Sequence, residues 1–297
     1  MADARKTGAI KNDGEKGEDT PLGKFVDYPE TYEPALLFAI PRAIGRGDLG
    51  ISADASLPFQ GEDFWTAFEI SWCNDHGMPQ VAVGEFVLPS ESPNIIESKS
   101  LKLYLNSLNQ HRLPSWALAQ QTMVDDLSLV AGAPVGVQLY RVDEYAAKGL
   151  TVGEGLCLDD RDVACTVYQP DSSLLALQRA ESDKLSRDQN VAETLYSHLM
   201  KSNCPVTGQP DWATISLSYR GQAICHDSLL RYIVSFREHQ GFHEHCVEKV
   251  FMDILQYCKP DELTVSARYT RRGGLDINPM RMSSGASMPK WVRTGRQ

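Results

Sequence analysis

The feature that most constrains the fold is an order of strands and helices that the sequence shows twice. In the first half, residues 63–72 and 80–88 have strand-like composition, and the Asn, Asp and Gly residues between them favour a turn. An amphipathic helix is predicted to begin near residue 97, followed by a second helix over 115–131 and a strand over 134–142. The first unit therefore has the order strand, strand, helix, helix, strand.

The second half of the sequence shows the same order. Residues 211–224 predict a hairpin that turns near Arg220–Gly221, helices are predicted over 227–239 and 242–258, and a strand is predicted over 262–270. Two such units, about 150 residues apart, indicate an internal duplication. Because the strands come as hairpins next to pairs of helices, we expect an α+β fold in which antiparallel sheets are backed by helix pairs.

Changes in composition along the chain set the predicted domain boundaries. Residues 1–22 are polar, charged and contain glycine, which predicts a disordered tail. The first ββααβ module is expected over residues 23–169 and the second over residues 191–297. The charged and weakly patterned residues 170–190 are predicted to connect the two modules.

Charge and hydropathy exclude several classes of protein. The 297 residues carry a formal net charge of -10, which argues against direct nucleic-acid binding over a large surface. No run of about 18 apolar residues predicts a membrane span, and the N-terminus has no apolar core typical of a signal peptide. We therefore expect a cytoplasmic protein whose seven cysteines are reduced.

A glycine-rich segment resembles a dinucleotide-binding motif but lacks its context. Gly45, Gly47 and Gly50 in GRGDLG match the pattern G-x-G-x-x-G. That pattern binds a dinucleotide when a strand precedes it and a helix opens within it. Pro41 precedes this segment and no helical periodicity follows it, so we expect a loop rather than a Rossmann-type site.

The segment HEHC at the start of a predicted helix allows three interpretations. His243 and Cys246 are three residues apart and could share a metal ion with Cys204. The segment could also be an ordinary polar helix start. In the third interpretation, which we favour, His243 lies at the inner edge of the apolar stripe and forms with Glu244 a pair that holds a polar heterocycle.

Two further segments carry candidate ligand-binding residues. Glu97 lies one turn before an apolar position of its helix, so it could cap the helix N-terminus or accept two parallel hydrogen bonds from a ligand. Three arginines and two glycines gather in RYTRRGG, which suits phosphate binding in an acidic chain. The alternative is a solvated basic strand end. The residues are Arg268, Arg271, Arg272, Gly273 and Gly274.

One cysteine stands on a segment that cannot form regular structure. Cys204 precedes Pro205 in SNCPVTGQPDW, so a turn should present its thiol, and Asp211 follows seven residues later. A thiolate is a strong nucleophile, and a nearby carboxylate could take up its proton or return one. An inert cysteine on a loop is the alternative.

Together these segments resemble a known family. ESKSLKLYLNSLNQ, SNCPVTGQPDW, SFREHQGFHEHCVE and RYTRRGGLDINP are similar to the signatures of the NADPH-dependent 7-cyano-7-deazaguanine reductases, the nitrile reductases of queuosine biosynthesis. The resemblance covers the chain from about residue 23 to its end, in the long two-module form. It implies tandem tunnelling-fold modules, a homodimer, and reduction of a nitrile to 7-aminomethyl-7-deazaguanine with two NADPH.

The resemblance also implies individual functions for matched residues. Cys204 corresponds to the nucleophile that forms a covalent thioimide, and Asp211 corresponds to the proton donor. The remaining matches contact either the 7-deazapurine substrate or NADPH, and no metal is expected. The substrate contacts are Ile96, Glu97, Ser98, His243 and Glu244, and the NADPH contacts are Ser98, Lys99, Arg272 and Gly273.

Two other functions remain open from the sequence. A zinc-dependent hydrolase of purine rings on the same fold would use a metal at Cys204. A purine-binding module without catalytic activity would need neither Cys204 nor Asp211, so the presence of both residues argues against it.

Overall fold

The computed structural model describes residues 29–52, 55–178, 190–286 and 291–297. The predicted tail, residues 1–22, lies outside the described residues. Residues 179–189 of the predicted connecting segment also lie outside them. None of the helices among the described residues combines the length and the apolar character needed to span a bilayer.

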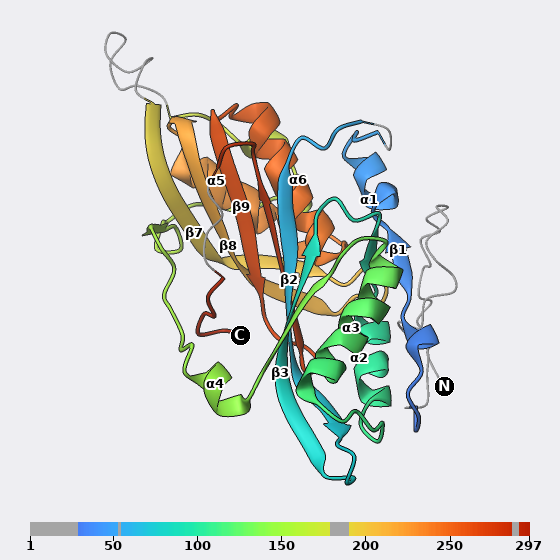
Figure 1. Cartoon of the computed structure of the whole chain (residues 1–297). Coiled ribbons are helices and arrows are strands. Elements are labelled where there is room, and N and C mark those ends of the chain that lie inside the picture. The colour runs from blue at the N-terminus through green and yellow to red at the C-terminus, as the bar shows by residue number, and fades with distance from the viewer. Residues whose placement is uncertain (1–28, 53–54, 179–189, 287–290) are drawn as a thin grey trace, which may run out of the picture.

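One eight-stranded sheet runs through both halves of the described chain, in the order β5-β3-β2-β10-β9-β8-β7-β6 (Figure 1). All pairings in this sheet are antiparallel except that of β6 with β7. A separate pair, β1 (Ala39–Pro41) and β4 (Asn94–Ile96), is also antiparallel. The strands of the large sheet are β2 (Gln60–Cys73), β3 (Pro79–Pro89), β5 (Gly136–Tyr140), β6 (Leu156–Cys157), β7 (Asn190–Asn203), β8 (Pro210–Gln222), β9 (Glu262–Tyr269) and β10 (Leu275–Met282).

Each half of the chain contributes a pair of long helices to one side of its strands. Figure 1 shows α2 and α3 beside the strands of the first half, and α5 and α6 beside those of the second. The bounds are α1 (Arg42–Asp48), α2 (Ser98–Ser107), α3 (Trp116–Ala131), α4 (Val142–Ala146), α5 (His226–Ser235) and α6 (His243–Tyr257), with 3₁₀ turns η1 (Pro34–Leu36), η2 (Ser172–Leu174) and η3 (Phe236–Glu238).

The predicted duplication is confirmed by the order of elements. The order β2, β3, α2, α3, β5 in the first half corresponds to β7, β8, α5, α6, β9 in the second. Both hairpins also contain the same kind of irregularity, since their registers shift between Ala67 and Ile70 and between Ser197 and Met200. This is the α+β arrangement of tandem ββααβ modules expected from the sequence.

The predicted hairpin over residues 211–224 is wrong. These residues belong to one continuous strand, β8, and Gly221 pairs with Val191 of β7 instead of forming a turn. The second hairpin is β7–β8, and its turn holds Cys204. The prediction failed because Arg220–Gly221 has turn-like composition, whereas β7 has a polar sequence that did not stand out as a strand.

A strand absent from the predictions joins the two halves. β10 pairs with β2 over residues Leu275 to Met282 and with β9 over Met280 to Met282. The side chains of Trp65 on β2 and Ile277 on β10 are register partners, and both line the cavity described below. β10 therefore places residues about 210 positions apart in sequence side by side, which no local pattern can reveal.

The G-x-G-x-x-G segment is helical, in contrast to the loop that we expected. Gly45 and Gly47 lie within α1, and Gly50 follows the helix with a φ of 73°. The helix begins at Arg42, before the first glycine, so the glycines do not form the turn between strand and helix that holds a pyrophosphate.

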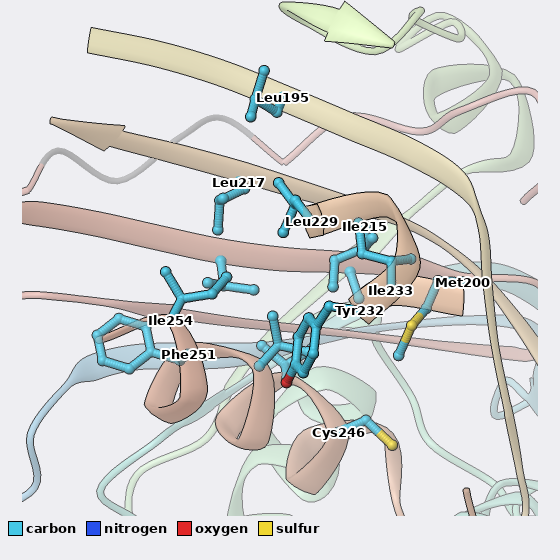
Figure 2. Packing of buried hydrophobic residues seen from close by; sticks show 14 of the residues in the cluster. Leu195, Met200, Ile215, Leu217, Leu229, Tyr232, Ile233, Cys246, Phe251 and Ile254 are labelled. Atoms are coloured by element: carbon cyan, nitrogen blue, oxygen red, sulfur yellow. The ribbon is translucent and has the colours of Figure 1, made fainter. Parts of the chain in front are cut away.

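Two clusters of buried side chains form the core, each built mainly from one half of the chain. In the second, Leu195, Ile215 and Leu217 of β7 and β8 pack toward α5 and α6 (Figure 2). Phe251 and Ile254 of α6 are fully buried there. Burying one such side chain contributes about 1.5–3 kcal/mol, so the predicted apolar stripe of α6 is a main source of stability.

A buried group of five charged side chains connects the modules. Arg42 of α1 donates to Asp63 of β2 at 2.6 Å, and Arg281 of β10 donates to the same carboxylate at 2.8 Å. Arg281 also donates to Glu248 of α6 at 2.9 Å, and Arg46 of α1 donates to Glu248 at 2.8 Å. We call these five residues the ion cluster. Removing Asp63 would leave Arg42 without its acidic partner, and removing Glu248 would do the same to Arg46, each at a cost of about 3–5 kcal/mol.

Candidate functional site

A cavity of about 320 Å³ lies where α2, the β7–β8 turn, the start of α6 and the β9–β10 turn meet. Every residue predicted for the site lines it except Glu97. The predicted residues on its wall are Ile96, Ser98, Lys99, Cys204, Asp211, His243, Glu244, Arg272 and Gly273. Residues from four separate parts of the sequence thus face one space.

The β7–β8 turn holds Cys204 in a defined position. The Cys204 N–H donates to the carbonyl of Gln209 at 2.9 Å, and the N–H of Gly208 donates to the carbonyl of Cys204 at 3.0 Å. Gly208 has a φ of 69°, which glycine adopts without strain. The Cys204 side chain is buried but borders the cavity. Its thiol is therefore fixed by main-chain hydrogen bonds at the cavity wall.

Asp211 lies on the adjoining strand with both carboxylate oxygens beside nitrogen atoms. It is the register partner of Ser202, two residues before Cys204 on β7. Arg272 Nη1 donates to Asp211 Oδ1, and His243 Nε2 lies 3.4 Å from Asp211 Oδ2. Asp211 is buried, so these two neighbours hold its carboxylate in a fixed orientation at the cavity wall.

His243 is held by a ring contact as well as by Asp211. Its imidazole stacks on the Tyr269 ring with a centroid separation of 3.6 Å and an interplanar angle of 0°. Its Nδ1 is buried and has no hydrogen-bond partner among the described residues. A buried nitrogen without a partner at a cavity wall is available to a ligand group.

Glu244 is a buried carboxyl at the start of α6. Burial, together with the nearby charge of Asp63, raises its pKa to about 7, although His243 and Arg42 favour its ionised form. The side chain is 4 % exposed and borders the cavity. Ligand N–H groups facing this carboxyl would supply hydrogen bonds that favour the carboxylate.

Glu97 forms the N-cap of α2. Its two carboxylate oxygens accept hydrogen bonds from the N–H groups of Lys99 and Ser100, each at 2.8 Å. Burial raises its pKa, and these two donors partly oppose that effect. The structure thus shows the capping interaction, and the additional contact of Glu97 with a substrate remains a prediction.

The three clustered arginines do not act together. The Arg268 guanidinium lies over the Trp291 ring at 4.3 Å, and that of Arg271 lies over the Phe68 ring at 4.3 Å. Arg272 alone of the three lines the cavity. Of the predicted basic cluster, the cavity therefore contains one guanidinium, that of Arg272, and this group forms an ion pair with Asp211.

A second lysine joins Lys99 and Arg272 at the cavity. Lys102, one turn along α2 from Lys99, also lines it, and its Nζ lies 3.8 Å from Glu69 Oε2. Gly273 has a φ of 57°, and a Cβ at this position would come within 3.3 Å of Lys102 Nζ. The glycine therefore lets the β9–β10 turn approach α2 closely.

Comparison with known proteins places the chain in a family. A family model described as "Nitrile reductase, 7-cyano-7-deazaguanine-reductase N-term" matches residues 28–139, and one described as "QueF-like protein" matches residues 210–287. The NADPH-dependent 7-cyano-7-deazaguanine reductase of Dechloromonas aromatica (strain RCB) is 51 % identical over 278 residues, covering 94 % of this chain and 95 % of that protein. The protein of the same name from Azoarcus sp. (strain BH72) is 53 % identical over 266 residues, covering 90 % and 91 %. The chain belongs to the 7-cyano-7-deazaguanine reductase family.

A solved structure of a QueF-like protein is a more distant relative. The archaeosine synthase QueF-Like in its apo form is 18 % identical, with a TM-score of 0.29, and the match covers 35 % of this chain and all of that chain. This likeness is too slight to support an argument about fold. Membership of the reductase family rests on the sequence matches, which confirm the resemblance noted from the four signature segments.

Several cavity residues of this reductase-family chain were missed by sequence analysis. The apolar part of the wall includes Trp65, Ile95, Phe242, Leu275 and Ile277, and the polar part includes Lys102, Gln209 and Thr270. Lys102 could have been found, because it follows Lys99 by three residues on a predicted helix. Trp65 and Ile277 could not, since their place depends on the pairing of β2 with β10.

The metal interpretation of HEHC is not supported by the geometry. Cys246 is fully buried in the core cluster and does not line the cavity, and burial raises the pKa of its thiol to about 12. A metal ion needs the thiolate, which this environment disfavours. Among the described residues, the group that could hold a metal ion lies elsewhere and consists of Cys157, Asp159 and His198.

Proposed function

We propose that the protein reduces the nitrile of 7-cyano-7-deazaguanine to 7-aminomethyl-7-deazaguanine in queuosine biosynthesis. The reaction consumes two NADPH and passes through a covalent thioimide on Cys204. Family membership supports the reaction class. The observation that carries the mechanism is that one hairpin brings both groups to the same cavity, Cys204 from its turn and Asp211 from its second strand.

The first step is addition of the thiol to the nitrile. The Cys204 sulfur forms a bond to the nitrile carbon, one π bond of the C≡N group breaks, and the nitrogen accepts a proton. That proton comes from the thiol and passes through Asp211, which takes it from sulfur and gives it to nitrogen. Arg272 and His243 fix the Asp211 carboxylate, so that transfer needs little rearrangement.

The start of α6 supplies the contacts for the 7-deazapurine ring. The ring N–H and the exocyclic amine of such a base form a donor pair that a carboxylate can accept in parallel. Within the described part of the chain, no ion pair engages the Glu244 carboxyl, and Nδ1 of the adjacent His243 has no hydrogen-bond partner. The aromatic residues Trp65 and Phe242 line the same cavity and suit a flat ring.

The cavity residues fit a phosphate-bearing nicotinamide cofactor. Lys99, Lys102 and Arg272 supply cationic groups, and Gly273 leaves space for a close approach of the main chain. We expect Ser98, Lys99, Lys102, Arg272 and Gly273 to hold NADPH, with a preference over NADH because a 2′-phosphate gains from a cationic partner. When bound, NADPH supplies the hydrides for the carbon, and the protein supplies orientation and proton transfer.

The subunit arrangement is proposed from the family resemblance. We infer a homodimer, which light scattering tests directly. The expected particle has twice the 33.0 kDa mass of the chain.

The decisive experiment mixes the protein with 7-cyano-7-deazaguanine. With NADPH, two cofactor molecules should be oxidised for each amine formed. Without NADPH, intact-protein mass should rise by one nitrile per chain at most, and Cys204→Ala should show no increase. A Cys204→Ala protein that still reduces the nitrile at near-parental rate would exclude the thioimide route.

The same assay separates the two alternative functions. A purine-ring hydrolase would not consume NADPH, and a binding module would form no adduct. A covalent product on Cys204, with NADPH consumed in turnover, would therefore favour the reductase over both.

A further inference from the structure

Cys157, Asp159 and His198 bring three potential metal ligands together outside the cavity. Cys157 is the last residue of β6, Asp159 follows two residues later, and His198 lies on the neighbouring strand β7. One ligand atom from each lies within 4.8 Å of the other two. None of the three lines the cavity, and the proposed reaction uses none of them.

A β-bulge places His198 in this group. The register between β7 and β8 shifts between Ser197 and Met200, so His198 lies in the irregular part of the strand. His198 Nδ1 is 2.8 Å from Thr214 Oγ1 on β8. With Nδ1–H donating to this hydroxyl, Nε2 carries the lone pair that a metal ion requires. Metal-binding histidines usually make such a second hydrogen bond, which fixes the tautomer and the ring.

The Asp159 carboxylate is also fixed by the protein. It accepts a hydrogen bond from Ser197 Oγ at 2.6 Å and one from the His198 N–H at 3.0 Å. Both donors belong to the same bulge, so the bulge orients the aspartate and the histidine together. Supporting contacts of this kind are typical of ligands in a built metal site.

The local charge favours a cation. The segment over residues 154–162, EGLCLDDRD, contains four acidic residues and one arginine. That arginine, Arg161, donates to Asp227 of α5 and so is already paired. A divalent cation near Cys157 would therefore meet a negative field.

We propose that Cys157, Asp159 and His198 bind a zinc ion, with water as the fourth ligand. Thiolate, imidazole and carboxylate are the donors that zinc takes in tetrahedral sites, whereas the hard cations Mg²⁺ and Ca²⁺ avoid sulfur. Zinc–ligand distances of about 2.0–2.3 Å imply donor separations of about 3.6 Å. The three side chains therefore need to close by at most about 1 Å, and the thiol proton is released on binding.

The zinc ion would hold a weakly attached segment against the sheet. β6 consists of two residues, and its strand partner in the described sheet is β7, to which it is parallel. A metal bridge between Cys157 and His198 fastens this segment to the strand that leads, six residues later, to Cys204. The role proposed for this zinc is to fasten the β6 segment, and the site lies apart from the cavity.

Metal analysis of the intact protein tests this inference. The protein is prepared with a phosphine reductant, loaded with zinc, passed through gel filtration and measured by mass spectrometry of the metal. We expect about one zinc per chain in the parent, and less than about one tenth of that in Cys157→Ser and His198→Ala. Cys165→Ser is the matched control, because Cys165 is also a free, half-buried thiol nearby in sequence, and it should retain the zinc.

Cobalt loading gives a test that does not depend on how the variants fold. Cobalt in the parent should show a near-ultraviolet band from thiolate-to-metal charge transfer and the strong visible bands of a tetrahedral site. Zinc that remains in both Cys157→Ser and His198→Ala, or cobalt in the parent without the thiolate band, would overturn the assignment. Retention of zinc by Cys204→Ala supports it, because it separates this metal from the cavity.

Discussion

The substitution Glu244→Gln should weaken substrate binding and stabilise the fold. Glutamine keeps the shape of the side chain and removes its charge. Burial raises the pKa of Glu244 from 4.5 to about 7, so the folded chain holds this proton more tightly than the unfolded chain does. Between these values the folded state binds more protons at residue 244, and its stability therefore falls as pH rises through this window.

The size of the effect follows from the pKa difference. At 1.36 kcal/mol per unit, ionising this carboxyl at pH 8 costs the folded state about 3 kcal/mol, while at pH 5 the cost is below about 1 kcal/mol. Glu244→Gln removes that cost. We therefore expect the stability difference between the variant and the parent to grow by about 2–3 kcal/mol, in favour of the variant, as the pH rises from 5 to 8.

Urea denaturation at several pH values measures this gain. Glu248→Gln is the matched control, because Glu248 lies one turn further along α6 and is also buried. The arginines around Glu248 lower its pKa despite its burial, so its loss should destabilise the fold by about 3–5 kcal/mol. A Glu244→Gln protein that is less stable than the parent at pH 8, or whose gain does not change with pH, would refute the reasoning.

Further predictions concern the reaction itself. Asp211→Asn should lower turnover by roughly 10²–10⁴-fold, the usual range for a group that transfers a proton. Mass spectrometry of this intact variant then shows whether the adduct on Cys204 still forms. Glu97→Ala should weaken nitrile binding at least tenfold in calorimetry, and unchanged binding would leave Glu97 as a helix cap only. Arg272→Ala and Lys102→Ala should each raise the KM for NADPH more than the KM for the nitrile, and a parent protein that uses NADH and NADPH equally would contradict the cofactor assignment.

Sequence patterns predicted the parts of the site that depend on short-range order. The Pro205 and Gly208 positions require a turn, so the placement of Cys204 at its start followed from composition. Helix α6 followed from its apolar stripe, and its first turn then carried His243 and Glu244 to the cavity.

The remaining parts depend on contacts that no local pattern contains. β10 lies between β2 and β9, and the sequence around it gave no sign of either partner. The ion cluster likewise joins Arg46 to Glu248, about 200 residues away. The sequence could not decide whether Glu97 caps helix α2 or contacts a ligand, because both functions require a carboxylate at the same position.

Helix α6 carries two buried glutamates with different functions, one in stability and one in the proposed ligand binding. Glu248 meets two arginine partners, and its charge helps to hold the modules together. Glu244, one turn earlier, is equally buried, and no arginine among the described residues forms an ion pair with it, so its charge costs stability. A ligand that donates hydrogen bonds to Glu244 would remove this cost as well as add contacts. Binding should therefore stabilise the fold more in the parent than in Glu244→Gln, because only the parent has an ionisable group whose cost the ligand can offset.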